Sequence, residues 1–206
     1  MQANQIANMV WSEATGTNDC TDNQYRAVKL NSQGAAPVTA VTDNVVGFQQ
    51  NAPTAINQSV SIESNGITLA VADGVVTKGL QVAISAAGGV VNAAQTITIA
   101  GTVVEGDVYA AVVNGTSYAF TALATPTATS VAAGLAALIN AASGIAATSA
   151  LGVITVTPSS ASVTISKVVT DSTAGTITID AKPTIVGNAL ASAVANDIFS
   201  IKLKNM

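Results

Sequence analysis

The distribution of charge along the chain constrains its fold more than any other feature. Between Leu80 and Ser166, only Glu105 and Asp107 carry an acidic or basic side chain. In all 206 residues, 9% are charged and 49% are hydrophobic, whereas a globular protein carries about 25% charged residues. Disorder combines high charge with low hydrophobicity, so the composition predicts a folded chain with a large core. The charge contrast indicates a distinct domain over 92–180.

Alternating β-branched residues predict strands within this domain. Asn114-Gly115 separates two alternating runs, and this pair favours the two-residue hairpin turn in which both central residues have positive φ. We expect strands at 95–100, 107–113 and 116–120, then at 152–158, 162–169 and 174–180. With one helix between the two groups, the predicted order is β-β-β-α-β-β-β, an α+β arrangement.

The helix is predicted over about 129–142. Its apolar stripe has the spacing i, i+4, i+7, i+8 of a helix face and consists of Val131, Leu135, Leu138 and Ile139. We expect Thr129 or Ser130 as the N-cap and Gly144 as the glycine that follows the helix.

The two flanking parts contain a short similarity. Val45-Val46-Gly47 leads through a loop to a strand pattern ending at 63, and Ile185-Val186-Gly187 leads through a similar loop to a pattern ending at 202. Two interpretations stay open, chance similarity in a biased composition and a true repeat. A true repeat would make the flanks one pseudo-symmetric β domain.

The residue types present exclude most catalytic chemistry. The chain has no histidine, which removes the Ser-His-Asp and Cys-His arrangements and the commonest metal ligand. Its single cysteine, Cys20, permits no internal disulfide. Two groups of oxygen-bearing side chains, Asp19 with Asp22 and Asn23, and Glu105 with Asp107, lack the full ligand set of a calcium site. They are interpreted as turn residues. We therefore expect no enzyme activity, catalytic residue, metal or cofactor.

Nucleic acid and membrane are not expected partners. The chain has 7 Lys and Arg against 11 Asp and Glu, a net charge of −4, and no basic stripe that could neutralise phosphates. Every apolar run is interrupted well before the roughly 18 residues of a transmembrane helix. The first residues lack the pattern of a secretory signal, so synthesis in the cytoplasm is expected.

The flanking sequence resembles the capsid cement, or head decoration, proteins of tailed bacteriophages. The similarity lies in short motifs over about 90 residues: Tyr25-Arg26-Ala27-Val28-Lys29-Leu30, Asp43-Asn44-Val45-Val46-Gly47-Phe48, Gln58-Ser59-Val60-Ser61-Ile62, 66–74 and Ile185-Val186-Gly187-Asn188-Ala189. The middle segment is similar to a β-rich module of phage tail and surface proteins. Its matching pieces are Gly106-Asp107-Val108-Tyr109, 113–122, the helix, and Gly152-Val153-Ile154-Thr155-Val156-Thr157.

These resemblances imply a mainly β protein whose four chain segments form three parts. They are an N-terminal arm (1–24), a small β-barrel-like cement domain built from both chain ends (25–91 and 181–206), and an inserted projecting domain (92–180). The implied function is a structural virion protein that binds the outer capsid surface and stabilises the assembled shell. Its implied partners are the major capsid protein and further copies of itself in a homotrimer.

Trp11 is the only tryptophan, and it either packs on its own domain or anchors the arm to a neighbour. We expect capsid or subunit contacts from six residues: Met9, Val10, Trp11, Tyr25, Arg26 and Phe48. The alternative function is a phage fibre or tail adhesin whose middle domain binds host-surface glycan. Sugar binding usually needs exposed aromatic rings; the aromatic residues available there are Tyr109, Tyr118 and Phe120, and most of them are expected in the core.

Overall fold

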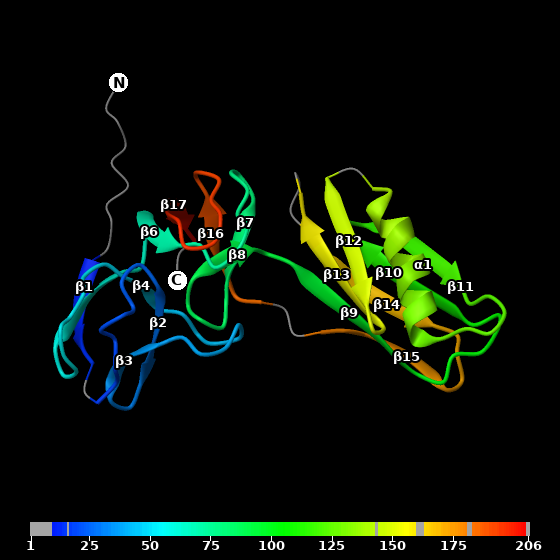
Figure 1. Ribbon diagram of the computed structural model, residues 1–206, viewed down its shortest axis with the longest axis horizontal. Coiled ribbons are helices and arrows are strands. Elements are labelled where there is room, and N and C mark those ends of the chain that lie inside the picture. The colour runs from blue at the N-terminus through cyan, green and yellow to red at the C-terminus, as the bar shows by residue number, and fades with distance from the viewer. Residues whose placement is uncertain (1–9, 16, 143, 160–162, 181–182, 205–206) are drawn as a thin grey trace, which may run out of the picture. The chain divides into compact units, whose positions relative to one another are not determined.

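The computed structural model describes residues 10–15, 17–142, 144–159, 163–180 and 183–204. The chain divides into two compact units (Figure 1). Unit 1 comprises Met1–Asn92 and Pro183–Met206, and unit 2 is the intervening stretch Ala93–Lys182. Both units consist largely of strands, with one helix in the described chain, so the predicted mainly β class is confirmed.

Unit 1 contains two five-stranded antiparallel sheets. The first sheet has the order β1-β5-β4-β2-β3, with strands β1 (Val10–Ala14), β2 (Ala27–Asn31), β3 (Gly34–Pro37), β4 (Gly47–Gln49) and β5 (Ser59–Glu63). The second sheet has the order β6-β17-β16-β7-β8, with strands β6 (Ile67–Val71), β7 (Gln81–Ile84), β8 (Val90–Asn92), β16 (Ile185–Ala189) and β17 (Ile198–Leu203).

The two sheets have the same strand topology. Taken in chain order, each places its first strand beside its fifth, then its fourth, second and third. The register is also the same, because Phe48 lies opposite Glu63 in the first sheet and Asn188 opposite Lys202 in the second. Unit 1 is therefore built from two copies of one five-stranded motif. Unit 2 enters between the third and fourth strands of the second copy.

The similarity between 45–63 and 185–202 corresponds to the fourth and fifth strands of the two copies. The shared glycine of each segment has a steric reason. A Cβ added to Gly47 would lie 2.6 Å from the carbonyl oxygen of Glu63 on β5, and a Cβ on Gly187 would be closer still to the carbonyl oxygen of Lys202 on β17. Since carbon and oxygen normally approach to about 3.3 Å, both positions require glycine.

The core of unit 1 lies between the two sheets. Its buried side chains come from the first copy, with Ala27 and Phe48, and from the second, with Ala70, Val186 and Ile201. Each sheet ends in strands that the described ladders do not join, so the expected β-barrel-like closure is corrected to two open sheets. Each copy has its own ladder, and the two sheets pack through buried side chains and through single backbone hydrogen bonds, such as that from the Ala27 N–H to the Gly88 carbonyl at 2.7 Å.

Unit 2 contains two sheets and the helix. One sheet has the order β11-β10-β14 and the other β12-β13-β9-β15. The elements are β9 (Gln95–Gly101), β10 (Val108–Val113), β11 (Thr116–Thr121), α1 (Ala128–Asn140), β12 (Ile145–Ala150), β13 (Val153–Pro158), β14 (Ile165–Thr170) and β15 (Gly175–Ile179). The core contains Tyr109, Leu135 and Ile154, all fully buried.

Unit 2 has one strand more than the predicted β-β-β-α-β-β-β. The additional strand, β12, follows the helix and pairs with β13 along its whole length. Its sequence, Ile-Ala-Ala-Thr-Ser-Ala, has low intrinsic strand preference, so pairing with β13 and contact with α1 decide its structure.

The helix begins slightly earlier than predicted. Thr127 is the N-cap: its hydroxyl accepts from the backbone N–H of Ser130, and the Ser130 hydroxyl accepts from the N–H of Thr127. The expected caps Thr129 and Ser130 lie inside the helix, and the helix ends at a C-cap at Ala141, three residues before Gly144. No helix in the described parts of the chain is long and apolar enough to cross a membrane.

Candidate interaction surfaces

Phe48, predicted as a capsid or subunit contact, is a core residue. Its side chain is 0% exposed and packs between the two sheets of unit 1. The neighbouring Gly47 and Gln49 are also buried, so the whole of β4 lies inside the unit. A fully buried ring cannot touch a partner, and the prediction for Phe48 was wrong.

Trp11 packs against its own unit while staying partly exposed. It lies on β1 opposite Ile62 of β5 and contacts a small buried cluster that includes Cys20 and Val60. This contact corresponds to the first of the two interpretations of Trp11. Val10 begins β1 opposite Glu63, and Met9 lies outside the described residues.

Tyr25 has a backbone conformation that is uncommon for a residue with a side chain. Its φ is 60°, and the equivalent position in the second copy is Gly79, with φ 86°. The Tyr25 N–H donates to the carbonyl of Gln49, and its carbonyl accepts from the N–H of Val71 on β6. The strained backbone of Tyr25 therefore connects the first copy of the motif to the second.

Arg26 is bound within unit 1. Its Nη1 atom donates to both carboxylate oxygens of Asp73, at 2.9 and 3.1 Å, and to the carbonyl of Ala87 at 3.0 Å. Asp73 also accepts from the Ser85 hydroxyl and from the N–H of Gly89 at 2.9 Å. The charge of Arg26 thus holds the β7–β8 turn against the first copy.

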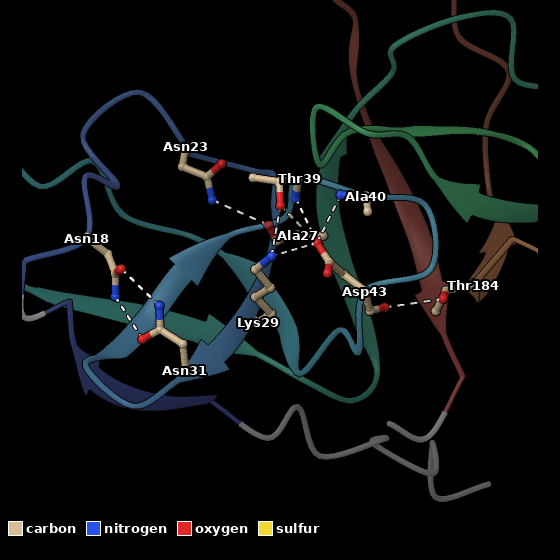
Figure 2. Close-up of polar contacts among 9 residues, drawn as sticks. All are labelled: Asn18, Asn23, Ala27, Lys29, Asn31, Thr39, Ala40, Asp43 and Thr184. Carbon is tan, nitrogen blue, oxygen red and sulfur yellow. Dashed lines mark hydrogen bonds and ion pairs between the residues drawn. The ribbon is translucent and has the colours of Figure 1, made fainter.

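Asp43 organises a second polar cluster (Figure 2). Its Oδ2 atom accepts from Lys29 Nζ at 2.8 Å and from the N–H groups of Thr39 and Ala40 at 2.8 and 2.9 Å. Its carbonyl accepts from the hydroxyl of Thr184, just before β16, at 3.3 Å. The hydrogen bond from Lys29, followed by that from Thr39, lowers the pKa of Asp43 to about 2. The cluster holds the 39–43 loop next to Thr184, at the point where the chain re-enters unit 1 after unit 2.

The acidic residues considered as cation ligands accept hydrogen bonds from nearby backbone N–H groups. Asp19 accepts from the N–H and hydroxyl of Thr21, and these bonds lower its pKa. It lies in a polar depression of about 350 Å³ lined by Asp19, Thr21, Asp22, Asn23, Arg26, Pro37 and Ala87. Hydrogen bonds from Ser172 and Val104 lower the pKa of Asp107. Within the described ranges, no three acidic or cysteine side chains gather to hold a metal ion.

An exposed apolar surface lies on the second copy of the motif. Ile67 and Leu69 on β6 are 47% and 38% exposed, and Ile198 on β17 is 55% exposed. Ile67 lies opposite Lys202, Leu69 opposite Ser200, and Ile198 opposite Val71, so all these side chains point to the same side of the sheet. We call Ile67, Leu69 and Ile198 the β6–β17 face. Sequence analysis missed this face because alternation does not show which side of a strand is solvated.

The first copy provides an internal comparison for this face. By register, Ser12 of β1 is equivalent to Leu69, and Ser59 of β5 is equivalent to Ile198. Both serines are exposed. Since the same fold forms with serine at these positions, the apolar side chains of Leu69 and Ile198 are not a requirement of the fold. Ile67, the third residue of the face, corresponds to Val10, which is also apolar. Exposed apolar side chains that folding does not need are typical of binding surfaces.

No protein-family model matches the chain, and no curated protein matches it. Among solved structures, a chain described as Mycobacterium phage Patience aligns with 100% of this chain and 95% of its own length, at 14% sequence identity and a TM-score of 0.30. A score of that size does not establish a common fold.

Proposed function

We propose that the chain is a structural virion protein that binds the outer surface of an assembled phage capsid and stabilises the shell. The observation that carries the proposal is the β6–β17 face, where the second copy of a duplicated motif has leucine and isoleucine in place of exposed serines. An exposed apolar sheet face fits a large protein surface, whereas small molecules bind in concave pockets. The resemblance of the flanking motifs to capsid cement proteins supports the same partner, the major capsid protein.

Stabilisation of the shell follows from mass action. A protein that binds the assembled lattice better than free capsid subunits shifts the equilibrium toward the intact shell. Many copies act on one shell, so a modest free energy at each site is sufficient. In this proposal the chain has no catalytic step and acts as a homotrimer on the outer capsid surface.

The ion pairs within unit 1 favour a rigid binding surface. The charges of Arg26 and Lys29 are paired with Asp73 and Asp43, each pair being about one-fifth exposed. These pairs hold loops of both copies in place, so little conformational entropy is lost when the β6–β17 face binds.

Co-sedimentation with purified capsids of the phage that encodes the chain tests the proposal. The double variant Leu69→Ser, Ile198→Ser gives the second copy the residues of the first at both positions. Removing two half-exposed apolar contacts should weaken capsid binding by roughly tenfold to a hundredfold.

The matched control is the double variant Leu30→Ser, Val41→Ser, which removes apolar side chains that are 47% and 39% exposed elsewhere in unit 1. It should bind capsids like the parent. If the β6–β17 variant sediments with capsids as the parent does, the proposed contact is refuted. Unfolding followed by Trp11 fluorescence verifies that unit 1 is folded in both variants.

The glycan-binding alternative receives no support from unit 2. Sugar recognition uses exposed aromatic rings, but Tyr109 is fully buried, and Tyr118 and Phe120 pack against the same core. Capsid binding is therefore the function that the described surfaces support best.

A further inference from the structure

The turn between β12 and β13 combines strain with exposure. Leu151 has a φ of 50° and is 91% exposed, and Gly152 follows with a φ of 84°. The β10–β11 turn has the same conformation, with φ 49° at Asn114 and 82° at Gly115. Asparagine tolerates the left-handed region, whereas leucine there costs roughly 1 kcal/mol. Leu151 therefore lowers the stability of the free chain while exposing an apolar side chain.

Two more exposed apolar residues lie at the same end of unit 2. Val104 follows β9 and is 51% exposed, and Leu123 follows β11 and is 69% exposed. Their loops adjoin, because the Gly106 N–H donates to the carbonyl of Ala122 at 2.9 Å. The Leu151 turn also reaches this end, since Gly152 lies against Ala128 at the start of α1 (Figure 1). We call Val104, Leu123 and Leu151 the distal end of unit 2.

These loops lie at the end of unit 2 that is opposite to its chain connections. The chain enters through the start of β9 and leaves through the end of β15, where Ile97 pairs with Ile179. At the other end of the same ladder Gly101 pairs with Gly175. The distal end lies beyond this second pair, one strand length from both connections, and is placed to contact another molecule.

The charges described at the distal end are all acidic. Glu105 and Asp171 are exposed, and Asp107 keeps its charge because hydrogen bonds from Ser172 and Val104 lower its pKa. A surface that fits the distal end should therefore be apolar and carry a cation nearby.

Unit 1 has a depression in which four of the seven lining residues are apolar; Lys78 lies beside it in the sequence, and the exposed Asp197 is part of its lining. It measures about 370 Å³ and is lined by Val75, Val76, Thr77, Ser192, Ala193, Val194 and Asp197. Apolar cavities of about 150 Å³ already accept benzene, so this depression can receive a leucine side chain. Val75 and Val194 on its rim are 68% and 60% exposed. Lys78, the residue after the lining residue Thr77 in the sequence, is also exposed.

The depression is formed before any partner binds. Val76 and Ala193 exchange two backbone hydrogen bonds of 2.9 and 3.0 Å across its floor, and the Lys78 N–H donates to the Ser192 hydroxyl at 3.1 Å. The Asp197 carboxylate accepts from the N–H of Val194 and so belongs to the wall. A preformed apolar site loses little entropy on binding.

We propose that the distal end of one copy docks into this depression on a second copy, with Leu151 inserted between Val75 and Val194. Lys78 of the receiving copy then lies near the acidic residues Glu105 and Asp171 of the inserted end. Such a contact joins two different surfaces of identical chains, and it forms a ring when the rotation closes, as in a trimer. The contact rests on the homotrimer of the proposed function and names the surfaces that would form it. It needs no capsid, so its test is separate from the test of capsid binding.

Light scattering of the full chain across a concentration series, without capsids, tests the contact. The parent should associate into multiples of 20.3 kDa. Leu151→Asn introduces the residue that the β10–β11 turn uses, so it should weaken association at least tenfold while the unfolding midpoint stays equal or rises. A merely misfolded variant would show the opposite change in midpoint.

Two further variants test each side of the contact. On the receiving copy, Val75→Asp should weaken association as strongly as Leu151→Asn, and Lys78→Glu should weaken it about threefold to tenfold. The control Leu138→Asn changes a helix residue that is 40% exposed outside the distal end and should associate like the parent. A parent that stays monomeric at every concentration, or a Leu151→Asn variant that associates like the parent, overturns the proposal.

Discussion

The substitution Gly47→Ala should destabilise unit 1 through backbone collision. The new Cβ would lie 2.6 Å from the Glu63 carbonyl oxygen and 3.1 Å from its carbonyl carbon, with the Cγ2 atom of Ile62 closer still. Since such contacts normally begin near 3.3 Å, β4 and β5 must separate by about 0.7 Å. That movement weakens the pairing of Phe48 with Glu63 and of Gln49 with Ile62.

The expected loss is about 3 kcal/mol, combining overpacking of 1–3 kcal/mol with one or two weakened hydrogen bonds of roughly 1 kcal/mol each. Urea unfolding followed by the fluorescence of Trp11 measures this loss specifically, because the only tryptophan of the chain lies in unit 1. With a denaturant dependence of about 2 kcal/mol per molar, the midpoint should fall by about 1.5 M.

The matched control is Gly74→Ala, whose Cβ would meet only the Cγ1 atom of Val91 at 3.3 Å. Because a side-chain methyl group can move, this variant should stay within about 0.5 kcal/mol of the parent. Gly187→Ala, the equivalent change in the second copy, should repeat the large loss. Equal midpoints for Gly47→Ala and Gly74→Ala would refute the steric explanation of the repeated glycine.

Two further predictions concern the interior and the charge pairs of unit 1. Phe48→Ala should lower the free energy of unfolding by about 3–5 kcal/mol, since it empties a site in the core; a loss below 1 kcal/mol in the Trp11-detected urea transition would contradict its burial. The pKa of Asp43, lowered to about 2 from about 3.9 when unfolded, predicts a stabilisation that is complete above roughly pH 4 to 5 and is lost as the pH falls toward 2. Asp43→Asn should remove about 1 kcal/mol at pH 6 and almost nothing at pH 2, and an equal loss at both pH values would contradict the assigned ion pair.

Sequence patterns located those strands whose own residues favour extended structure. The runs around Ile97, Val112 and Ile154 alternate β-branched and small residues, and each forms a strand. Strands such as β3 and β12 consist mainly of alanine, glycine and small polar residues, and they form because a neighbouring strand supplies hydrogen-bond partners. Local preference carries no information about such partners, so these strands could not be predicted from their own sequence.

The contact residues were harder to predict than the strands. Phe48 was expected at a surface because a strand pattern does not show that β4 has neighbouring strands on both edges and buried side chains throughout. Arg26 was expected to be available, but its partner Asp73 lies 47 residues later and meets it only through the duplicated architecture. Burial and pairing of this kind depend on the tertiary structure and not on spacing along the chain.

The duplication separates what the fold requires from what it does not. Requirements of the five-stranded motif act on both copies, and they explain why Gly47 and Gly187 share one position. At the exposed positions occupied by Ser12 and Leu69 the copies differ in chemistry although their backbone pairing is the same. A difference that the fold does not require is consistent with a contact that only the second copy makes. In the function proposed above, the capsid contact therefore lies on the second copy, and the first copy is its structural counterpart.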